Sequence, residues 1–233
     1  MRTKSNEKRL QIIRVATDIF LERGFSSASM SGIAAAVGGS KTTLYSHFDS
    51  KEELFLEVMK SLASGRVEMA FASLRLNGDI STTLRKFGEY YLEVTCSEDI
   101  LKIFRIGISE SGNSSAGKLL YEHGPKLCRT RISEFFSEQI KKNIIKECSP
   151  WLAAIHYLRL IESDLSELYL LGSRPQPSRT EIIDSVNSGV DIFLSAYRYI
   201  GKGRVQEATC PAPRTGRRLL GVESGMSSGK ERS

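Results

Sequence analysis

Apolar side chains recur at helical spacing along nearly the whole chain up to residue 200. The first stripe consists of Ile12, Ile13, Ala16, Ile19 and Phe20 and marks one face of an amphipathic helix that ends near Gly24. Further stripes predict helices at about 29–37, 40–48, 50–62, 80–92, 99–109, 119–140, 151–171 and 180–200. Strict alternation of apolar and polar residues, bounded by turns, does not occur. The pattern therefore predicts an all-α fold.

Turn and capping residues separate these helices. Ser29 can cap the second helix, which the pair Gly38-Gly39 ends, and Ser40 can cap the third. Ser50 with Glu53 has the spacing of a capping box ahead of the fourth. The pair Gly124-Pro125 should break or kink the stretch 119–140, because proline lacks an amide donor and clashes with the preceding turn.

The last part of the chain, residues 201–233, is rich in Gly, Pro, Ser and Arg and holds little apolar surface. We therefore expect a disordered basic tail. An auxiliary nucleic-acid arm built on Arg214, Arg217 and Arg218 is one reading of this tail. A solvated segment without a specific role is the favoured one.

Composition excludes several classes of protein. The chain has 233 residues, of which 40% are hydrophobic and 26% charged, which is typical of a soluble protein with a sizeable core. No apolar run approaches the length of a membrane span, and the basic start reaches no apolar segment of a secretory signal. Four scattered cysteines, Cys96, Cys128, Cys148 and Cys210, fit a reduced cytoplasmic chain.

The net charge of +6 is unevenly distributed. Residues 1–52 hold eight Lys and Arg against five Asp and Glu, residues 53–200 hold eighteen against nineteen, and residues 201–233 hold seven against three. A basic segment ahead of a nearly neutral body is typical of a DNA-binding module joined to another domain. Ordinary solvated surface gives the same pattern, so the charge alone decides little.

The region 10–60 carries the strongest functional signal. Three short helices separated by glycine-containing turns match a helix-turn-helix with a supporting first helix. We expect the third helix to bury Leu44 and Phe48 and to expose Lys41, Thr42, Thr43, Tyr45, Ser46 and His47. Such a face, with donors and no acid, suits the major groove of DNA. A plain polar surface on a small helix has the same composition.

Three sequence marks in this region resemble the tetracycline-repressor (TetR/AcrR) family of bacterial regulators. They are A-x-x-x-F-x-x-x-G-F at 16–25, I-A-x-x-x-G at 33–38, and S-K-x-T-L-Y-x-H-F followed by S-K-E-x-L-F at 40–55. The stretch 84–125 is similar, less specifically, to AefR-like C-terminal domains of that family. The resemblance implies a basic arm at 1–9, a DNA-binding domain at 10–60, and a ligand-binding and dimerisation domain at 61–200.

The resemblance also implies a homodimeric regulator, usually a repressor, on a roughly palindromic double-stranded DNA operator. The residues expected to touch DNA are Ser29, Met30 and Ser31 of the second helix, Lys41, Thr42, Thr43, Tyr45, Ser46 and His47 of the third, and Lys51 of the fourth. The basic residues Arg2, Lys4, Lys8 and Arg9 of the arm would add phosphate or minor-groove contacts.

Three positions depart from the family pattern. Gly32 replaces an acidic or other polar residue, and helix-interior glycine costs roughly 1 kcal/mol relative to alanine. Gly39 replaces a valine in the turn, and Ser31 replaces a frequently basic residue. Together these departures predict a mobile DNA-binding head when no DNA is bound.

The C-terminal domain is expected to supply a dimer interface and an effector cavity. The last two long helices, around Trp151–Leu168 and Ile182–Ala196, carry broad apolar faces that either form this interface or pack within one subunit. Side chains expected to face an unknown small-molecule effector, by default an apolar or aromatic one, are Phe87, Tyr91, Phe104, Ile108, Tyr121 and Phe135. Plain core packing is the favoured explanation of such aromatic residues.

Signals of catalysis are weak. GGSKTT lacks the glycines and the preceding strand of a phosphate-binding loop, and the three histidines have no metal-binding spacing. His123 is expected on the surface. Thiolate sensing at Cys96 or Cys128 is an open alternative to inert thiols. We therefore expect no enzyme, cofactor or metal; the rival to a DNA-binding regulator is a ligand-binding or adaptor protein that has lost operator binding.

Overall fold

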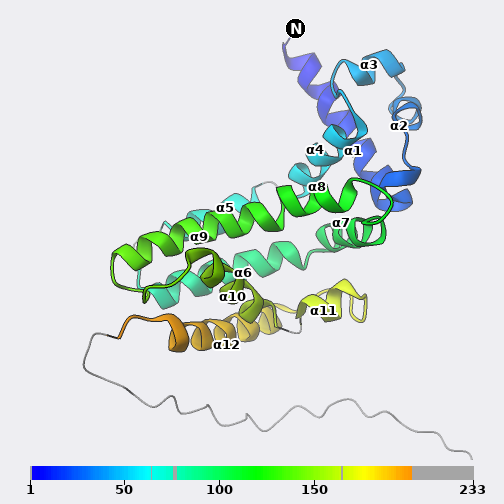
Figure 1. Ribbon diagram of the computed structural model, residues 1–233. Coiled ribbons are helices and arrows are strands. Elements are labelled where there is room, and N and C mark those ends of the chain that lie inside the picture. Colours follow the sequence, from blue (N-terminus) through cyan, green and yellow to red (C-terminus); the bar gives the residue numbers. More distant parts are fainter. Residues whose placement is uncertain (1, 64, 76–77, 164, 201–233) are drawn as a thin grey trace, which may run out of the picture.

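The computed structural model describes residues 2–63, 65–75, 78–163 and 165–200, with side chains described from residue 5 (Figure 1). These residues form helices and no strand; a single isolated bridge pairs Ile145 with Arg198. The helices are α1 (Arg2–Ser27), α2 (Met30–Ala36), α3 (Lys41–Tyr45), α4 (Lys51–Ala63), α5 (Arg66–Ser73), α6 (Ile80–Thr95), α7 (Glu98–Ser109), α8 (Ala116–His123), α9 (Pro125–Lys141), α10 (Pro150–Glu162), α11 (Leu165–Leu170) and α12 (Arg179–Tyr197). The all-α prediction is confirmed. The predicted tail, 201–233, lies outside the described residues.

Helices α1–α4 form a small unit at one end of the molecule, which we call the head, and α5–α12 form the larger body (Figure 1). The helix α1 begins at Arg2, so residues 2–9 of the expected arm belong to the first helix. Near its other end α1 is broken at Gly24, whose φ of 78° and ψ of 173° are not helical. Glycine adopts this positive φ without the steric cost that a side chain imposes.

Serine side chains cap the helices that follow the turns of the head, as the sequence predicts. Ser29 caps α2 by accepting a hydrogen bond from the Gly32 amide at 3.1 Å, and Ser40 caps α3 by accepting from the Thr43 amide at 3.0 Å. Ser50 likewise accepts from the Glu53 amide, whereas the Glu53 carboxylate accepts from the amide of Asp49. These local bonds fix the helix-turn-helix geometry.

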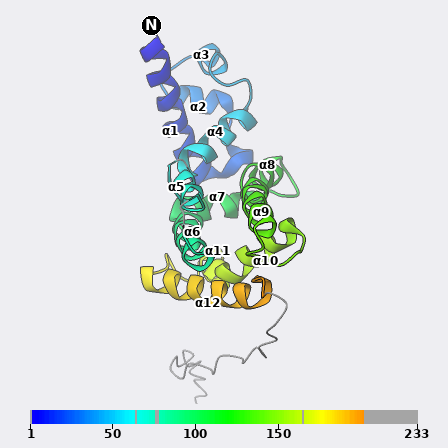
Figure 2. The same cartoon turned by 90° about the vertical axis from the view of Figure 1, so that its left-hand side faces the viewer.

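The body has two sides joined by a base. Figure 2 shows α5 and α6 on one side, α8 and α9 on the other, and α12 across the bottom. The break at Gly124-Pro125 separates α8 from α9, as predicted. The single helix predicted over 151–171 is wrong, because α10 ends at Glu162 and Ser163 has a positive φ of 42°.

The hydrophobic side chains form two clusters. One fills the body and includes Phe87, Phe136, Tyr157 and Phe193, which contact one another through their rings. The other fills the head but also takes in Ile103 of α7 together with Ala116 and Leu120 of α8. The head therefore shares its core with two helices of the body.

No helix in the described part of the chain combines the length and the apolar character that a membrane span requires.

Close backbone contact holds the base of the body together. Gly189 of α12 lies against α10, where a Cβ atom would stand 2.6 Å from the carbonyl carbon and oxygen of Leu160. Ser185, one turn earlier, donates a hydrogen bond to the carbonyl of Ile161 at 2.8 Å. The two helices therefore approach as closely as a missing side chain permits.

Replacing Gly189 by alanine should lower the free energy of unfolding by about 2 kcal/mol, because the added methyl meets backbone atoms that cannot turn aside. Urea denaturation followed by circular dichroism measures this loss. Gly112→Ala is the matched control, since a Cβ at Gly112 meets nothing within 4 Å. Equal stability of the two variants would contradict the close packing described here.

Candidate DNA-binding surface and effector cavity

The outer face of α3 lies at the end of the head, far from the base of the body (Figure 1). Lys41, Thr42, Tyr45 and Ser46 are exposed, while Leu44 is buried in the head core. The ammonium group of Lys41 stands 5.8 Å from the centre of the Tyr45 ring, one helical turn away. The described residues of this face thus offer one cation, two hydroxyl side chains and an aromatic ring to a partner.

Some expected DNA contacts lie at the edge of this face or are already engaged. The Thr43 hydroxyl is 2.9 Å from that of Ser40, and His47 is half-buried. Ser29 is exposed but its hydroxyl caps α2, and Ser31 is exposed on α2. The Ser46 hydroxyl donates to the Thr43 carbonyl at 2.8 Å. Thr43, Ser29 and Ser46 therefore have fewer free hydrogen-bonding positions than the sequence suggests.

Two of the residues expected to touch DNA contact the interior of the head in this structure. Met30 is only 7% exposed, because the first turn of α2 rests on α1 and buries it. Lys51 points inward and donates to the carbonyl oxygens of Phe25 at 2.9 Å and Ala28 at 3.0 Å. Its ammonium also stands 4.3 Å from the centre of the Phe25 ring. Lys51 thus holds the α1–α2 turn against α4.

Two basic residues of the predicted arm are also engaged within the head. Lys8 donates to the side chain of Gln11 and to the carbonyl of Val37. Arg9 forms an ion pair with Glu57 of α4, and its guanidinium lies 5.0 Å from the centre of the Phe48 ring. The side chains of Arg2 and Lys4 lie outside those described.

A carboxylate from the body clamps the end of α1. Glu110, at the end of α7, accepts hydrogen bonds from the Ser26 amide at 2.9 Å and from the Ser26 hydroxyl at 2.6 Å. It also accepts from the Ser114 hydroxyl at 2.9 Å. Burial raises the pKa of Glu110, but the hydrogen bonds from Ser26 and Ser114 outweigh it and hold that pKa below its ordinary value. We call this arrangement the Glu110 clamp.

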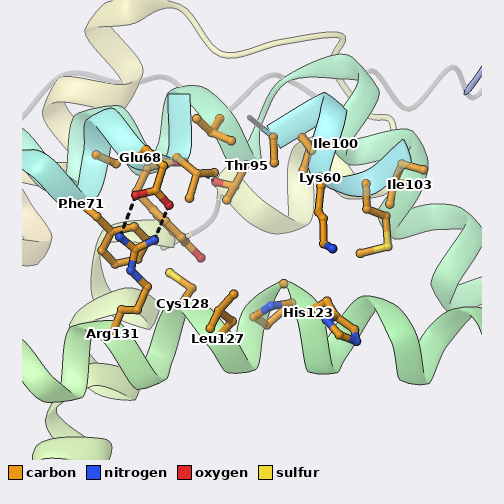
Figure 3. A pocket seen from close by; sticks show the side chains of 18 of the residues that line it. Lys60, Glu68, Phe71, Thr95, Ile100, Ile103, His123, Leu127, Cys128 and Arg131 are labelled. Atoms are coloured by element: carbon orange, nitrogen blue, oxygen red, sulfur yellow. Dashed lines mark hydrogen bonds and ion pairs between the residues drawn. The ribbon is translucent and has the colours of Figure 1, made fainter. Parts of the chain in front are cut away.

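A mostly apolar cavity, which we call the main cavity, lies in the body next to the head and has a volume of about 370 Å³ (Figure 3). Helices α4 to α9 all contribute to its walls. Most of the lining is apolar, including Met59, Val94, Ile100 and Ile103. Such a space suits an apolar or aromatic small molecule.

The predicted cavity residues separate into two groups. Phe87, Tyr91 and Phe104 line the main cavity. Ile108 and Tyr121 are 57% and 44% exposed, and Phe135 lines a second cavity farther along α9, so these three are corrected. Helical periodicity shows that a helix has an apolar face but not which neighbour that face meets.

Several polar residues of the main cavity were not singled out from the sequence. They are Lys60, Glu68, Thr95 and Arg131, and the histidine expected on the surface, His123, is exposed at the cavity edge. Glu68 and Arg131 are far apart in sequence, so no local spacing of residues predicts their contact. An arginine within the apolar stripe of α9 was the one signal available.

Two further polar groups mark the inner wall. The Tyr91 hydroxyl donates to the buried carboxylate of Glu162 at 2.7 Å, and Glu162 also pairs with Arg159. Burial, reinforced by Glu162, raises the pKa of Tyr91 well above its ordinary value. Burial likewise raises the pKa of Cys128 to about 12, so its thiol stays protonated at neutral pH. This disfavours thiolate sensing at Cys128.

Among the residues that the structure describes, no three His, Cys, Asp or Glu side chains come together as a metal site would require.

Comparison with known proteins identifies the family. Residues 82–199, half of the chain, match the C-terminal domain of AefR-like transcriptional repressors. Residues 12–58 match bacterial regulatory proteins of the TetR family. The chain belongs to the TetR family. Both parts of the resemblance seen in the sequence are thereby confirmed.

Solved TetR-family structures resemble this chain over nearly their full length. The flavonoid-responsive regulator FrrA is 32% identical with a TM-score of 0.70, and the match covers 83% of this chain and 98% of FrrA. A TetR-family regulator from Mesorhizobium loti is 28% identical, with the same TM-score and coverage. The fold of a TetR-family regulator therefore extends over both head and body.

Curated TetR-family relatives match over shorter stretches. The transcriptional activator FasR of Mycolicibacterium smegmatis is 35% identical over 92 residues, which is 40% of this chain and 42% of FasR. The regulator AcrR of Shigella flexneri is 33% identical over 98 residues, 41% of this chain and 45% of AcrR. The match spans less than half the length of these two relatives, both of which are transcriptional regulators.

The expected dimer helices of this TetR-family chain correspond to α10 and α12. Most of their apolar residues, including Leu158, Val186 and Phe193, are buried within the subunit. Trp151 and Leu152 of α10 and Ile192 of α12 remain exposed. These exposed side chains are available to a second subunit.

Replacing Glu110 by glutamine should make the free energy of unfolding depend less on pH in the acid range. The folded-state pKa of Glu110 is depressed, so its carboxylate stabilises the fold above its ordinary pKa of 4.5, and this stabilisation is lost as pH falls through the lower folded-state value. We expect E110Q to lose about 1 kcal/mol at neutral pH and progressively less in acid. Urea denaturation at a series of pH values measures this.

The control for this experiment is Glu147→Gln, since Glu147 is an exposed carboxylate elsewhere in the body. A difference between E110Q and the parent that stays constant from neutral to acid pH would show that the charge of Glu110 does not hold the clamp.

Proposed function

We propose that this chain is a dimeric, sequence-specific DNA-binding regulator, acting as a repressor that a small molecule in the main cavity releases from its operator. The observation that carries the proposal is the exposed face of α3, with Lys41, Tyr45 and two hydroxyl side chains directed away from the core. A helix so short makes few contacts, so useful affinity needs two half-sites of a roughly palindromic operator and hence two subunits. The chain would act in the cytoplasm and would have no catalytic role.

The shared core supports a route from ligand to DNA. Ile103 and Leu120 belong to the head core and also line the main cavity. A ligand that displaces them favours a head position unsuited to two successive major-groove faces, and thereby shifts the population away from the DNA-binding state. An aromatic effector fits the apolar walls, and the name of FrrA, a flavonoid-responsive relative, supports the same class.

A second candidate is a ligand-binding or adaptor protein that has kept the fold and lost operator binding. The engagement of Lys8 and Lys51 within the head favours it, because both cations are drawn away from a phosphate backbone. The direction of regulation is a separate question, since FasR is named an activator.

The deciding experiment is fluorescence anisotropy of the purified protein on DNA flanking its own gene, titrated across salt concentration, with an unrelated duplex as control. Saturable, salt-dependent binding with a strong preference for the flanking DNA supports the regulator. If the protein binds both duplexes equally and weakly, a selection from random duplexes follows. If that selection yields no preferred sequence, the protein is a ligand-binding or adaptor protein that has lost operator binding. A promoter–reporter fusion then distinguishes repression from activation.

Replacing Tyr45 by alanine should abolish specific operator binding while leaving the dimer intact. Each dimer loses one contact in each half-site, which corresponds to a loss of affinity of more than about a hundredfold. Anisotropy measures the affinity, and light scattering after size exclusion measures the dimer.

Tyr121→Ala is the matched control for Tyr45→Ala. Tyr121 is 44% exposed against 42% for Tyr45, and it also lies beside a cation, Arg129 at 5.7 Å. Because Tyr121 lies on the body, its loss should leave operator binding unchanged. A dimer that falls apart in Tyr45→Ala would contradict the role assigned to Tyr45.

Replacing Ile192 by aspartate should dissociate the dimer, because it puts an unpaired charge in the expected α10–α12 interface. Analytical ultracentrifugation at micromolar concentration should then find monomers, and operator affinity should fall with them. Ile108→Asp, at an equally exposed isoleucine of α7, should remain dimeric. If the Ile192→Asp variant stays dimeric, the dimer interface does not include Ile192.

A further inference from the structure

A charged partition separates the main cavity from the second one. Arg131 of α9 and Phe71 of α5 line both the main cavity of about 370 Å³ and the second cavity of about 450 Å³. Figure 3 shows the Arg131 side chain rising from α9 to meet Glu68 of α5, with the Phe71 ring beside it. The apolar main cavity therefore ends at a guanidinium group.

The contact between Arg131 and Glu68 has the geometry of a two-point salt bridge. The two guanidinium nitrogens donate to the two carboxylate oxygens at 2.6 Å and 3.0 Å. The centre of the guanidinium lies 3.6 Å from that of the Phe71 ring, which holds the group flat. A carboxylate thus fits this side of Arg131 without further adjustment of the arginine.

The two partners differ in how firmly they are held. The Arg131 side chain is mostly covered and stacked on Phe71, whereas the Glu68 side chain is largely exposed on the surface of α5. The hydrogen bonds from Arg131 lower the pKa of Glu68, so Glu68 is ionised at neutral pH. Because the Glu68 carboxylate is largely exposed, water solvates it when it leaves the pair, and this lowers the free-energy cost of its displacement.

We propose that the main cavity binds a monoanionic aromatic acid, whose ring system occupies the apolar part and whose carboxylate replaces that of Glu68 on Arg131. The inference rests on the proposed function, because it concerns the effector of the same cavity. Glu68 acts as an internal substitute for the ligand carboxylate, and Arg131 is the residue that selects acids over neutral analogues.

The other polar groups of the cavity are poorer anchors for an anion. The ammonium of Lys60 is largely exposed and already paired with Glu57 at 2.8 Å on its own helix. The Tyr91 hydroxyl donates its proton to Glu162. Arg131 alone among these three presents a stacked, flat pair of donors that matches a carboxylate.

Displacement of Glu68 has a structural consequence. The helix α5 packs mainly on α6, and α9 packs on α8 and α10, so the Glu68–Arg131 pair spans the space between the two sides of the body. An acid bound to Arg131 removes this tie and frees α5 to move. Because α5 follows α4 of the head, the movement begins beside the DNA-binding unit.

The test uses three small probes on the full-length protein. Binding of the neutral dye N-phenylnaphthylamine is followed by its fluorescence, and naphthoate and naphthamide are then compared as competitors. These two share a ring system and differ in a carboxylate against an amide. Naphthoate should compete about tenfold better than naphthamide, as expected for a charge-assisted two-point contact.

Three variants assign the preference to Arg131. R131M keeps the aliphatic stem but removes the charge, and should abolish the preference for naphthoate while still binding the dye. E68Q removes the competing carboxylate and should strengthen naphthoate binding. R129M is the control, because Arg129 lies two residues away and lines neither cavity; it should behave like the parent.

The outcomes separate this inference from the proposed function. If the dye binds but the two competitors are equal, or if R131M keeps the preference, the acid-binding role of Arg131 is wrong and an effector cavity for neutral molecules stands. If the dye does not bind the parent protein at all, the main cavity is not an effector site and both proposals for it fail. DNA binding in the anisotropy experiment is independent of either result.

Discussion

The head completes its hydrophobic core with side chains of the body, and the rest of the structure depends on this shared core. Its four helices bury Phe20, Phe25 and Phe55 against one another, but the cluster is completed by Ile103 and Leu120 of the body. A short chain buries a smaller fraction of its surface than a long one, so side chains contributed by the body add to the stability of the head. Because the same two side chains also line the main cavity, the stability of the head and the content of the cavity cannot be independent.

The helices of the body are closely packed at the base and are separated by a cavity toward the head. Around Gly189 and Gly88, α6, α10 and α12 approach closely, and the buried aromatic rings of Phe136, Tyr157 and Phe193 fill the space between helices. Toward the head, the two sides of the body are separated by the main cavity and tied by an exposed ion pair. A ligand bound in the main cavity would therefore act where the helices are held together least, away from the base that carries the expected dimer surface.

The sequence predicts local features of this protein well and long-range contacts poorly. The caps Ser29 and Ser40 and the break at Gly124-Pro125 follow from bonds within a few residues, so the head and the α8–α9 boundary were predicted. The inward turn of Lys51 was not predicted, because it depends on carbonyl groups more than twenty residues away.

The same limit explains the cavity. Phe87 and Ile108 both lie on apolar stripes, yet one faces the cavity and the other solvent, since only the arrangement of neighbouring helices decides between them. Helix α10 ends at Glu162 although the apolar pattern continues, because periodicity reports which residues share a face and not whether the backbone stays helical.

Gly24 lies where the end of α1 contacts the body, and two features of the structure disfavour a side chain at this position. Its positive φ disfavours any side chain, and a Cβ there would stand 2.8 Å from the carboxylate of Glu110. A hybrid regulator assembled from this head and the body of a relative would consequently need a matching partner for the 24–26 turn. An exchange of domains must therefore preserve the contacts among Gly24, Ser26, Glu110 and Ser114. Choosing a single junction along the chain is not sufficient.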